Sequence, residues 1–111
     1  MRQQLPLQFD RQFRLWSYRV TQRRLELRTD RNFEVGETLY VIFLDVLAMQ
    51  VRNSFQKLEI AEAEDIVAMD DFADIPGRHS SRYLRLSVGD GQHTGFVVCA
   101  TIDTRIEPPE M

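Results

Sequence analysis

Apolar and polar residues alternate in the first third of the chain in the way that is typical of β-strands. The run FRLWSYRV, residues 13–20, places Trp16, Tyr18 and Val20 on one face of such a strand. After the polar link TQRR, the run LELR, residues 25–28, alternates in the same way. Two alternating runs that flank a short polar link predict a β-hairpin.

The central run TLYVIFLDVLAMQV, residues 38–51, is the most apolar part of the chain and fits two structures. Its first half is rich in β-branched and aromatic residues, as expected for a strand that is buried on both faces. From Leu44 onward apolar residues also recur at helical spacing, although Asn53 and Ser54 would be unfavourable inside a helix. We favour a long, bulged strand, with a helix over residues 44–57 as the alternative.

Three further runs complete the predicted set of strands. They are KLEIAEAE (57–64), RYLRLSV (82–88) and FVVCATI (96–102). About six short strands separated by turns predict a mainly β fold, either an antiparallel sandwich or a small barrel. The length of 111 residues predicts a single domain over 1–111, with residues 1–8 and 107–111 poorly ordered.

Amino-acid composition indicates the broad class of protein to which the chain belongs. Apolar residues make up 43% of the chain, which is enough for one core, and no run is long and apolar enough for a membrane span. The first residues lack the apolar stretch of a secretory signal. Cys99 is the one cysteine, which excludes an internal disulfide and fits a reducing cytoplasm. We therefore expect a small soluble cytoplasmic domain.

Charge is distributed unevenly along the chain, although the net charge is only -3. Residues 1–31 contain eight arginines and three carboxylates, whereas residues 59–75 contain seven carboxylates and no basic residue. Arginine dominates the basic residues, since Lys57 is the one lysine. The two blocks can neutralise each other within the fold or present separate faces to partners.

The acidic segment EAEDIVAMDDFADIPG, residues 62–77, lacks the ligand spacing of a calcium-binding EF-hand loop, so we expect no metal site. Ile66, Met69 and Phe72 recur at helical spacing and predict a short helix within 64–74 that packs these side chains on the sheet. The same helix can present carboxylates to a basic partner or to the chain's own arginines. The candidate binding residues are Glu62, Glu64, Asp65, Asp70, Asp71 and Asp74.

Residues suited to catalysis are few. His79, which lies beside Ser80 and Ser81, and His93 are both in turn-like segments, and the glycine-framed nucleophile elbow is absent. Cys99 lies in an apolar run and is expected to be a core residue rather than a nucleophile. We therefore expect neither an enzyme activity nor a cofactor.

The N-terminal strand offers an alternative binding surface, formed by Arg14, Trp16, Tyr18 and Arg19. Arginines interleaved with aromatic residues are typical of a platform that stacks bases and binds phosphates. The pI of about 5.3 argues against a nucleic acid, because phosphate-binding domains usually have a net basic surface. A small ligand or a nucleic acid at this strand is the alternative to a protein partner, and ordinary core packing explains the aromatic residues without any ligand.

The segments FRLWSYRVTQRRLELRTDR, LYVIFLDVLAMQV and FQKLEIAEAE resemble small bacterial single-domain proteins in which similar strands open a β-rich fold. Some proteins of this type resemble immunity proteins of polymorphic toxin systems. The resemblance implies a non-catalytic protein that binds a partner protein, and it assigns no particular residue. We expect protein–protein binding through the acidic residues 59–75 to a basic surface, as in an immunity or inhibitor protein. An exposed edge strand would also permit a homodimer.

Overall fold

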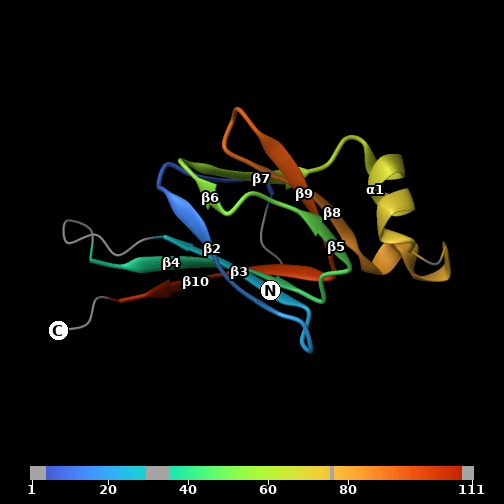
Figure 1. Ribbon diagram of the computed structural model, residues 1–111, viewed down its shortest axis with the longest axis horizontal. Helices are drawn as coiled ribbons and strands as arrows, with labels where there is room; N and C mark the ends of the chain where they lie inside the picture. The colour runs from blue at the N-terminus through green and yellow to red at the C-terminus, as the bar shows by residue number, and fades with distance from the viewer. Residues whose placement is uncertain (1–4, 30–35, 76, 109–111) are drawn as a thin grey trace.

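The computed structural model describes residues 5–29, 36–75 and 77–108, without the side chains of residues 78–80, as two five-stranded antiparallel sheets packed face to face (Figure 1). The strand orders are β1-β7-β8-β9-β5 and β10-β4-β3-β2-β6. The strands are β1 (Leu7–Phe9), β2 (Phe13–Arg19), β3 (Arg24–Thr29), β4 (Thr38–Leu44), β5 (Ala48–Gln50), β6 (Ser54–Phe55), β7 (Leu58–Glu62), β8 (Leu84–Gly89), β9 (Thr94–Cys99) and β10 (Thr101–Glu107). The predicted antiparallel sandwich is confirmed, and the sheets do not close into a barrel.

The predicted hairpin is confirmed as β2 and β3. A β-bulge shifts their register between Leu15 and Ser17, so the alternation of inward and outward side chains reverses at this point. The prediction that Trp16, Tyr18 and Val20 share one face is therefore wrong. Trp16 and Val20 are exposed, whereas Tyr18 packs against the core.

The central apolar run forms neither one long strand nor a helix. It is divided between β4 and β5, which belong to different sheets. Asp45 ends β4 in the left-handed conformation, with φ of 56°. The Val46 N–H then donates to the Arg23 carbonyl and the Leu47 N–H to the Val98 carbonyl, each at 2.9 Å. Successive residues thus bond to opposite sheets, and the run stays apolar because the crossing itself is buried.

The predicted strand over 96–102 crosses between the sheets in the same way. It is divided into β9 and β10 at Ala100, whose N–H donates to the Leu44 carbonyl at 3.0 Å. The two crossings are therefore adjacent, and together they join the sheets at one corner. This division and that of the central run, with the short strands β1 and β6, raise the strand count in the described residues from about six to ten.

One core fills the space between the sheets. Its buried members are Phe13, Leu25, Leu27, Val41, Phe43, Val46, Phe55, Leu58, Ile60, Leu86, Val88, Val97, Cys99 and Ile102. In β4, Leu39, Val41 and Phe43 face this core, so Tyr40 and Ile42 face outward. The cross-strand pairs of Tyr40 and Ile42 then identify which side chains of the neighbouring strands lie on the outer face.

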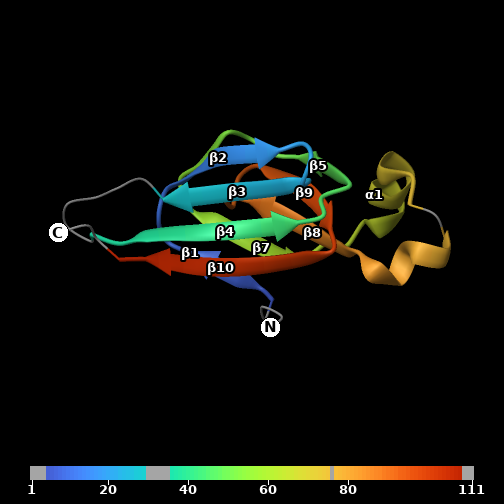
Figure 2. The same ribbon diagram turned by 90° about the horizontal axis from the view of Figure 1, so that it is seen from below.

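The predicted short helix is confirmed as α1 (Ile66–Ala73), and it lies beyond one end of the sandwich (Figures 1 and 2). Asp65 caps its N-terminus, because the carboxylate accepts a hydrogen bond from the Ala68 N–H at 3.3 Å. Asp74 ends the helix in the left-handed conformation. Within the described part of the chain, no helix has the length and apolar character that crossing a membrane requires.

The N-terminal segment contains a strand that the sequence pattern does not reveal. Leu7 and Gln8, which we expected to be poorly ordered, belong to β1, and β1 pairs with β7 at the edge of the sheet. At the other end of the chain, Glu107 is the last residue of β10. Residues 1–4 and 109–111 of the two segments expected to be poorly ordered lie outside the described residues.

Candidate functional site

Helix α1 is attached to the outer face of β8 and β9 by an ion pair and a ring contact. Arg85 donates from Nε to Asp70 Oδ1 at 2.8 Å and from Nη2 to Asp70 Oδ2 at 3.2 Å, which is the bidentate geometry of a strong pair. The rings of Phe72 and Phe96 meet edge to face, with centroids 5.5 Å apart. Asp70 therefore pairs with an arginine of its own chain, one that lies far from the N-terminal basic block.

Met69 and Ala73 of α1 are half-buried, whereas the other apolar side chains of the helix are exposed. Ile66, Val67 and Phe72 are 47%, 69% and 67% exposed, and no side chain of the helix is buried. The prediction that these apolar side chains pack on the sheet is therefore wrong for Ile66. Phe72 contacts the sheet only through the edge-to-face contact with Phe96. We define the α1 surface as Ile66, Val67 and Phe72 with the exposed carboxylates Glu62, Glu64, Asp65, Asp71 and Asp74.

The outer face of the β10-β4-β3-β2 sheet carries a second candidate surface, seen from the front in Figure 2. We define the arginine face as Arg14, Trp16, Arg19, Arg24, Arg28 and Arg105. Cross-strand pairing places Tyr40 between Arg105 and Arg28. Arg28 in turn lies opposite Arg14, so one row of side chains crosses four strands.

The predicted ligand-binding residues are divided between the two sides of this sheet. Arg14, Trp16 and Arg19 belong to the arginine face, whereas Tyr18 pairs with Leu25 and packs against the core. Trp16 is 50% exposed. The guanidinium carbon of Arg28 lies 3.1 Å from the centre of the Trp16 ring, so the two groups stack.

Glu26 lies among the arginines of this face and is only 7% exposed. Ser17 Oγ donates to Glu26 Oε2 at 2.7 Å, and Arg24 Nη2 donates to Glu26 Oε1 at 3.2 Å. Burial by itself raises the pKa of Glu26, but these hydrogen bonds and the charges of Arg24 and Arg19 outweigh burial and lower the pKa below its ordinary value. Glu26 is therefore an anion at neutral pH and offsets part of the arginine charge.

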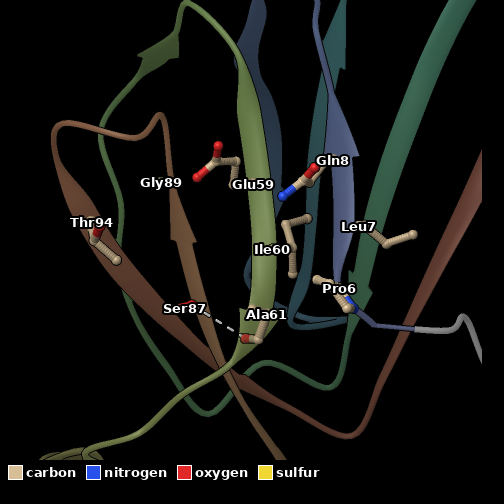
Figure 3. A pocket seen from close by; sticks show the side chains of 9 residues that line it. All are labelled: Pro6, Leu7, Gln8, Glu59, Ile60, Ala61, Ser87, Gly89 and Thr94. Carbon is tan, nitrogen blue, oxygen red and sulfur yellow. Dashed lines mark hydrogen bonds between the residues drawn. The ribbon is translucent and has the colours of Figure 1, made fainter.

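Two of the hollows on the described surface are lined by residues other than the predicted ligand-binding residues. The first, of about 120 Å³, lies on the other sheet between β1, β7 and β8, where Ser87 Oγ donates to the Ala61 carbonyl at 3.3 Å (Figure 3). It is smaller than the roughly 300–1,000 Å³ of typical small-molecule sites. The second, of about 300 Å³, is open and is lined by polar residues of loops, Lys57 and Asp90 among them. Neither supports a small ligand on the N-terminal strand.

Cys99 and His93 are the described residues that bear on the prediction about catalysis. Cys99 is buried, and burial, together with the charge of Asp45, raises the pKa of its thiol to about 12, so the thiol is not a nucleophile at neutral pH. His93 lies in an exposed turn where Asp90 accepts its backbone N–H at 2.8 Å. The side chain of His79 lies outside the described residues. Within the described ranges, no three His, Cys, Asp or Glu side chains are grouped to hold a metal ion.

Three arginines of the arginine face were not among the candidate residues. Arg24 and Arg28 alternate with Leu25 and Leu27, so the pattern of β3 alone could have placed them outward with Glu26. Arg105 had no such signal, because only the pairing of β10 with β4 brings it beside Tyr40. Its guanidinium carbon lies 4.8 Å from the centre of the Tyr40 ring.

The two surfaces are thus defined by this chain's own residues. Comparison with protein-family models, with curated proteins and with solved structures gave no significant match.

Proposed function

We propose that the protein is a non-catalytic protein-binding module that contacts its partner through the α1 surface. One observation carries this proposal: three large apolar side chains of one short helix are 47–69% exposed among five exposed carboxylates. Several exposed apolar side chains on one short element are typical of surfaces that bind other molecules, whereas single ones are ordinary. The three exposed side chains of α1 therefore support a docking role for the helix.

The attachment of α1 also supports this role. A helix of eight residues is marginally stable by itself, so its contacts with the sheet determine whether it persists. Asp70 and Phe72 supply those contacts, through Arg85 and Phe96. Ile66 and Val67 contribute little to this attachment, since about half or more of each side chain is exposed. A helix that is fixed but leaves its apolar side chains exposed is organised for an external contact.

The chemistry of the surface indicates the kind of partner. Carboxylates beside exposed apolar side chains complement a basic surface that also has apolar groups, and such complementarity mainly accelerates association and sets specificity. An eight-residue helix is only about 12 Å long, so a partner with a standard interface of about 800 Å² per side would extend beyond α1. Glu62, the last residue of β7, and Glu64, in the link between β7 and α1, are the nearest extension.

An immunity or inhibitor protein would use such a surface against a basic toxin. We include this role in the proposal because the α1 surface is strongly acidic. We also place the protein in the cytoplasm, which the single buried thiol of Cys99 supports.

The test uses two exposed valines that differ in position. Val67 is 69% exposed on α1, and Val20 is 75% exposed beside the β2–β3 turn. Val67→Arg and Asp71→Arg each add positive charge to the α1 surface, whereas Val20→Arg adds the same arginine elsewhere. A partner would be captured from the cells that make the protein, purified, and its binding measured by calorimetry. We expect affinity to fall at least about tenfold in both α1 variants, as for a central interface residue, and to be unchanged in Val20→Arg.

Salt and self-association complete this test. The association rate should fall as ionic strength rises, because the carboxylates steer a basic partner. Sedimentation of the purified protein distinguishes a foreign partner from a second copy of the chain. Equal binding by wild type and both α1 variants would show that the partner contacts another surface and would refute the proposal.

A further inference from the structure

We propose that the arginine face binds single-stranded nucleic acid, with phosphates on its arginines and one base stacked on Trp16. This site is separate from the α1 surface. The arginine face lies on the outer side of the β10-β4-β3-β2 sheet, while α1 is attached to the opposite sheet and lies beyond the end of the sandwich (Figure 2). The proposal therefore does not depend on the function proposed for α1.

The spacing of the arginines follows from the sheet. Arg14 and Arg28 are on neighbouring strands, and Arg105 is two strands from Arg28, across Tyr40. Neighbouring strands are about 4.8 Å apart, so this row extends over roughly 14 Å. Arg19 and Arg24 form a second pair on the same face. Two rows of arginines on one sheet can bind successive phosphates of a flexible single strand over several nucleotides.

The charge of the face is positive even though the whole chain is acidic. Its carboxylates, identified by the same register, are Glu26, Asp103 and Glu107, so five arginines face three carboxylates. Glu26 is nearly covered and already bonded to Ser17 and Arg24. The acidic residues of the α1 surface lie elsewhere. The low pI, which argued against a nucleic acid, therefore does not describe this face.

Two arginines of the face retain unused donors. The Nε atoms of Arg24 and Arg28 are buried and have no hydrogen-bond partner among the described atoms. A buried donor without an acceptor lowers stability, and a phosphate oxygen would remove that cost once the side chain shifts enough to expose the donor. The rigid, planar guanidinium group suits the oxygens of a phosphate.

Trp16 gives the reason to favour a nucleic acid over an acidic protein. The β-bulge turns Trp16 outward, and the guanidinium group of Arg28 stacks on its ring. Half of the side chain remains exposed, beside cations that would bind the adjoining phosphates. Bases of a single strand stack on exposed aromatic side chains, whereas the bases of a duplex are already stacked on one another. The arrangement therefore fits a single strand.

The experiment is a titration of labelled oligothymidylate with the full chain at low salt, followed by fluorescence anisotropy. Trp16→Ala should weaken binding roughly tenfold, because a stacked base contributes that much in similar platforms. Arg28→Ala and Arg19→Ala should weaken it and should each reduce the slope of log affinity against log salt by about 0.7. Arg82→Ala, an exposed arginine that lies outside the arginine face, should change neither quantity.

Three outcomes would overturn the inference. The first is no saturable binding of oligothymidylate by the wild type. The second is equal binding of a duplex of the same length, or of polyglutamate, which would show a site for any polyanion. The third is an equal loss in Arg82→Ala and Arg19→Ala. Arg19 is exposed, so Arg19→Ala keeps the test valid if Trp16→Ala does not fold.

Discussion

Glu26 is the residue on which the arginine face depends. Two arginine pairs, Arg14 with Arg28 and Arg19 with Arg24, lie directly opposite each other on β2 and β3. Like charges in that position destabilise a sheet. The carboxylate of Glu26 lies on the same face and stays ionised, because hydrogen bonds and nearby arginines lower its pKa. The buried carboxylate of Glu26 thus reduces the repulsion between the arginines that lie opposite each other on the hairpin.

Glu26→Gln tests this role. At neutral pH we expect the free energy of unfolding to fall by about 1.5–3 kcal/mol, the contribution of hydrogen bonds to a charged group. The folded pKa lies below the ordinary value of 4.5, so the contribution is complete at higher pH and is lost as pH falls through the folded pKa. In urea unfolding at neutral and acid pH, wild type should therefore lose more stability than Glu26→Gln. Parallel losses would contradict the assignment, and Glu64→Gln, which changes an exposed carboxylate, provides the comparison.

At the scale of an element, strand β5 depends on a glycine of its neighbour. A side-chain carbon added at Gly95 would overlap the carbonyl group of Gln50, which is backbone and cannot turn aside. We expect Gly95→Ala to destabilise the fold by about 1–3 kcal/mol and to loosen β5. Urea unfolding and amide exchange over 48–50 measure both effects. Gly77→Ala should be nearly neutral, because a carbon there meets nothing within 4 Å, and equal effects would count against this explanation.

Helix α1 depends on its ion pair with the sheet. Asp70→Asn keeps the shape of the side chain and removes its charge, so the bond with Arg85 weakens. Amide exchange over 66–73 should accelerate about two- to fivefold, as expected from roughly 0.5–1 kcal/mol for a partly exposed pair. Asp71→Asn makes the same charge change on an exposed neighbour and should leave exchange unaltered. If both variants exchange alike, the pair does not hold the helix.

At the scale of the whole molecule, the two sheets share one core and are joined by two adjacent crossings, so they should unfold together. The chain contains a reporter for each sheet: Trp16, its one tryptophan, in β2 and Cys99, its one cysteine, in β9. Burial and a pKa of about 12 keep the Cys99 thiol unreactive until the fold opens. Trp16 fluorescence and Cys99 labelling should therefore give the same urea midpoint. Two separate midpoints would mean that the sheets unfold independently.

The position of the two charged blocks, residues 1–31 and 59–75, is also a property of the whole molecule. Among the residues that the structure describes, the two blocks lie apart, since Asp70 pairs with Arg85 of β8 and the exposed carboxylates of α1 are distant from the arginine face. Opposite charges instead pair locally, as for Glu26 with Arg24 on the arginine face and Asp70 with Arg85 beside α1. A chain with a net charge of only -3 thus carries an acidic surface and a basic one at separate places.

Sequence by itself determined the features that depend on neighbouring residues. Alternation identified the β2–β3 hairpin and the mainly β class, and helical spacing identified α1 within residues 64–74. It also placed the exposed acidic residues around α1, because Asp65 and Asp74 are the caps of that helix. These features follow from the backbone period and from local hydrogen bonds, both of which are readable from a short window of residues.

Only the tertiary structure decided which strands share a sheet and which side chains share a face. The crossings at Asp45 and Ala100 depend on hydrogen bonds to distant residues, so a continuous apolar run concealed them. The bulge that turns Trp16 outward depends on how β2 pairs with β3, and the place of Arg105 beside Tyr40 depends on the pairing of β10 with β4. Burial and pairing are properties of the assembled sandwich, and they convert scattered arginines into one surface.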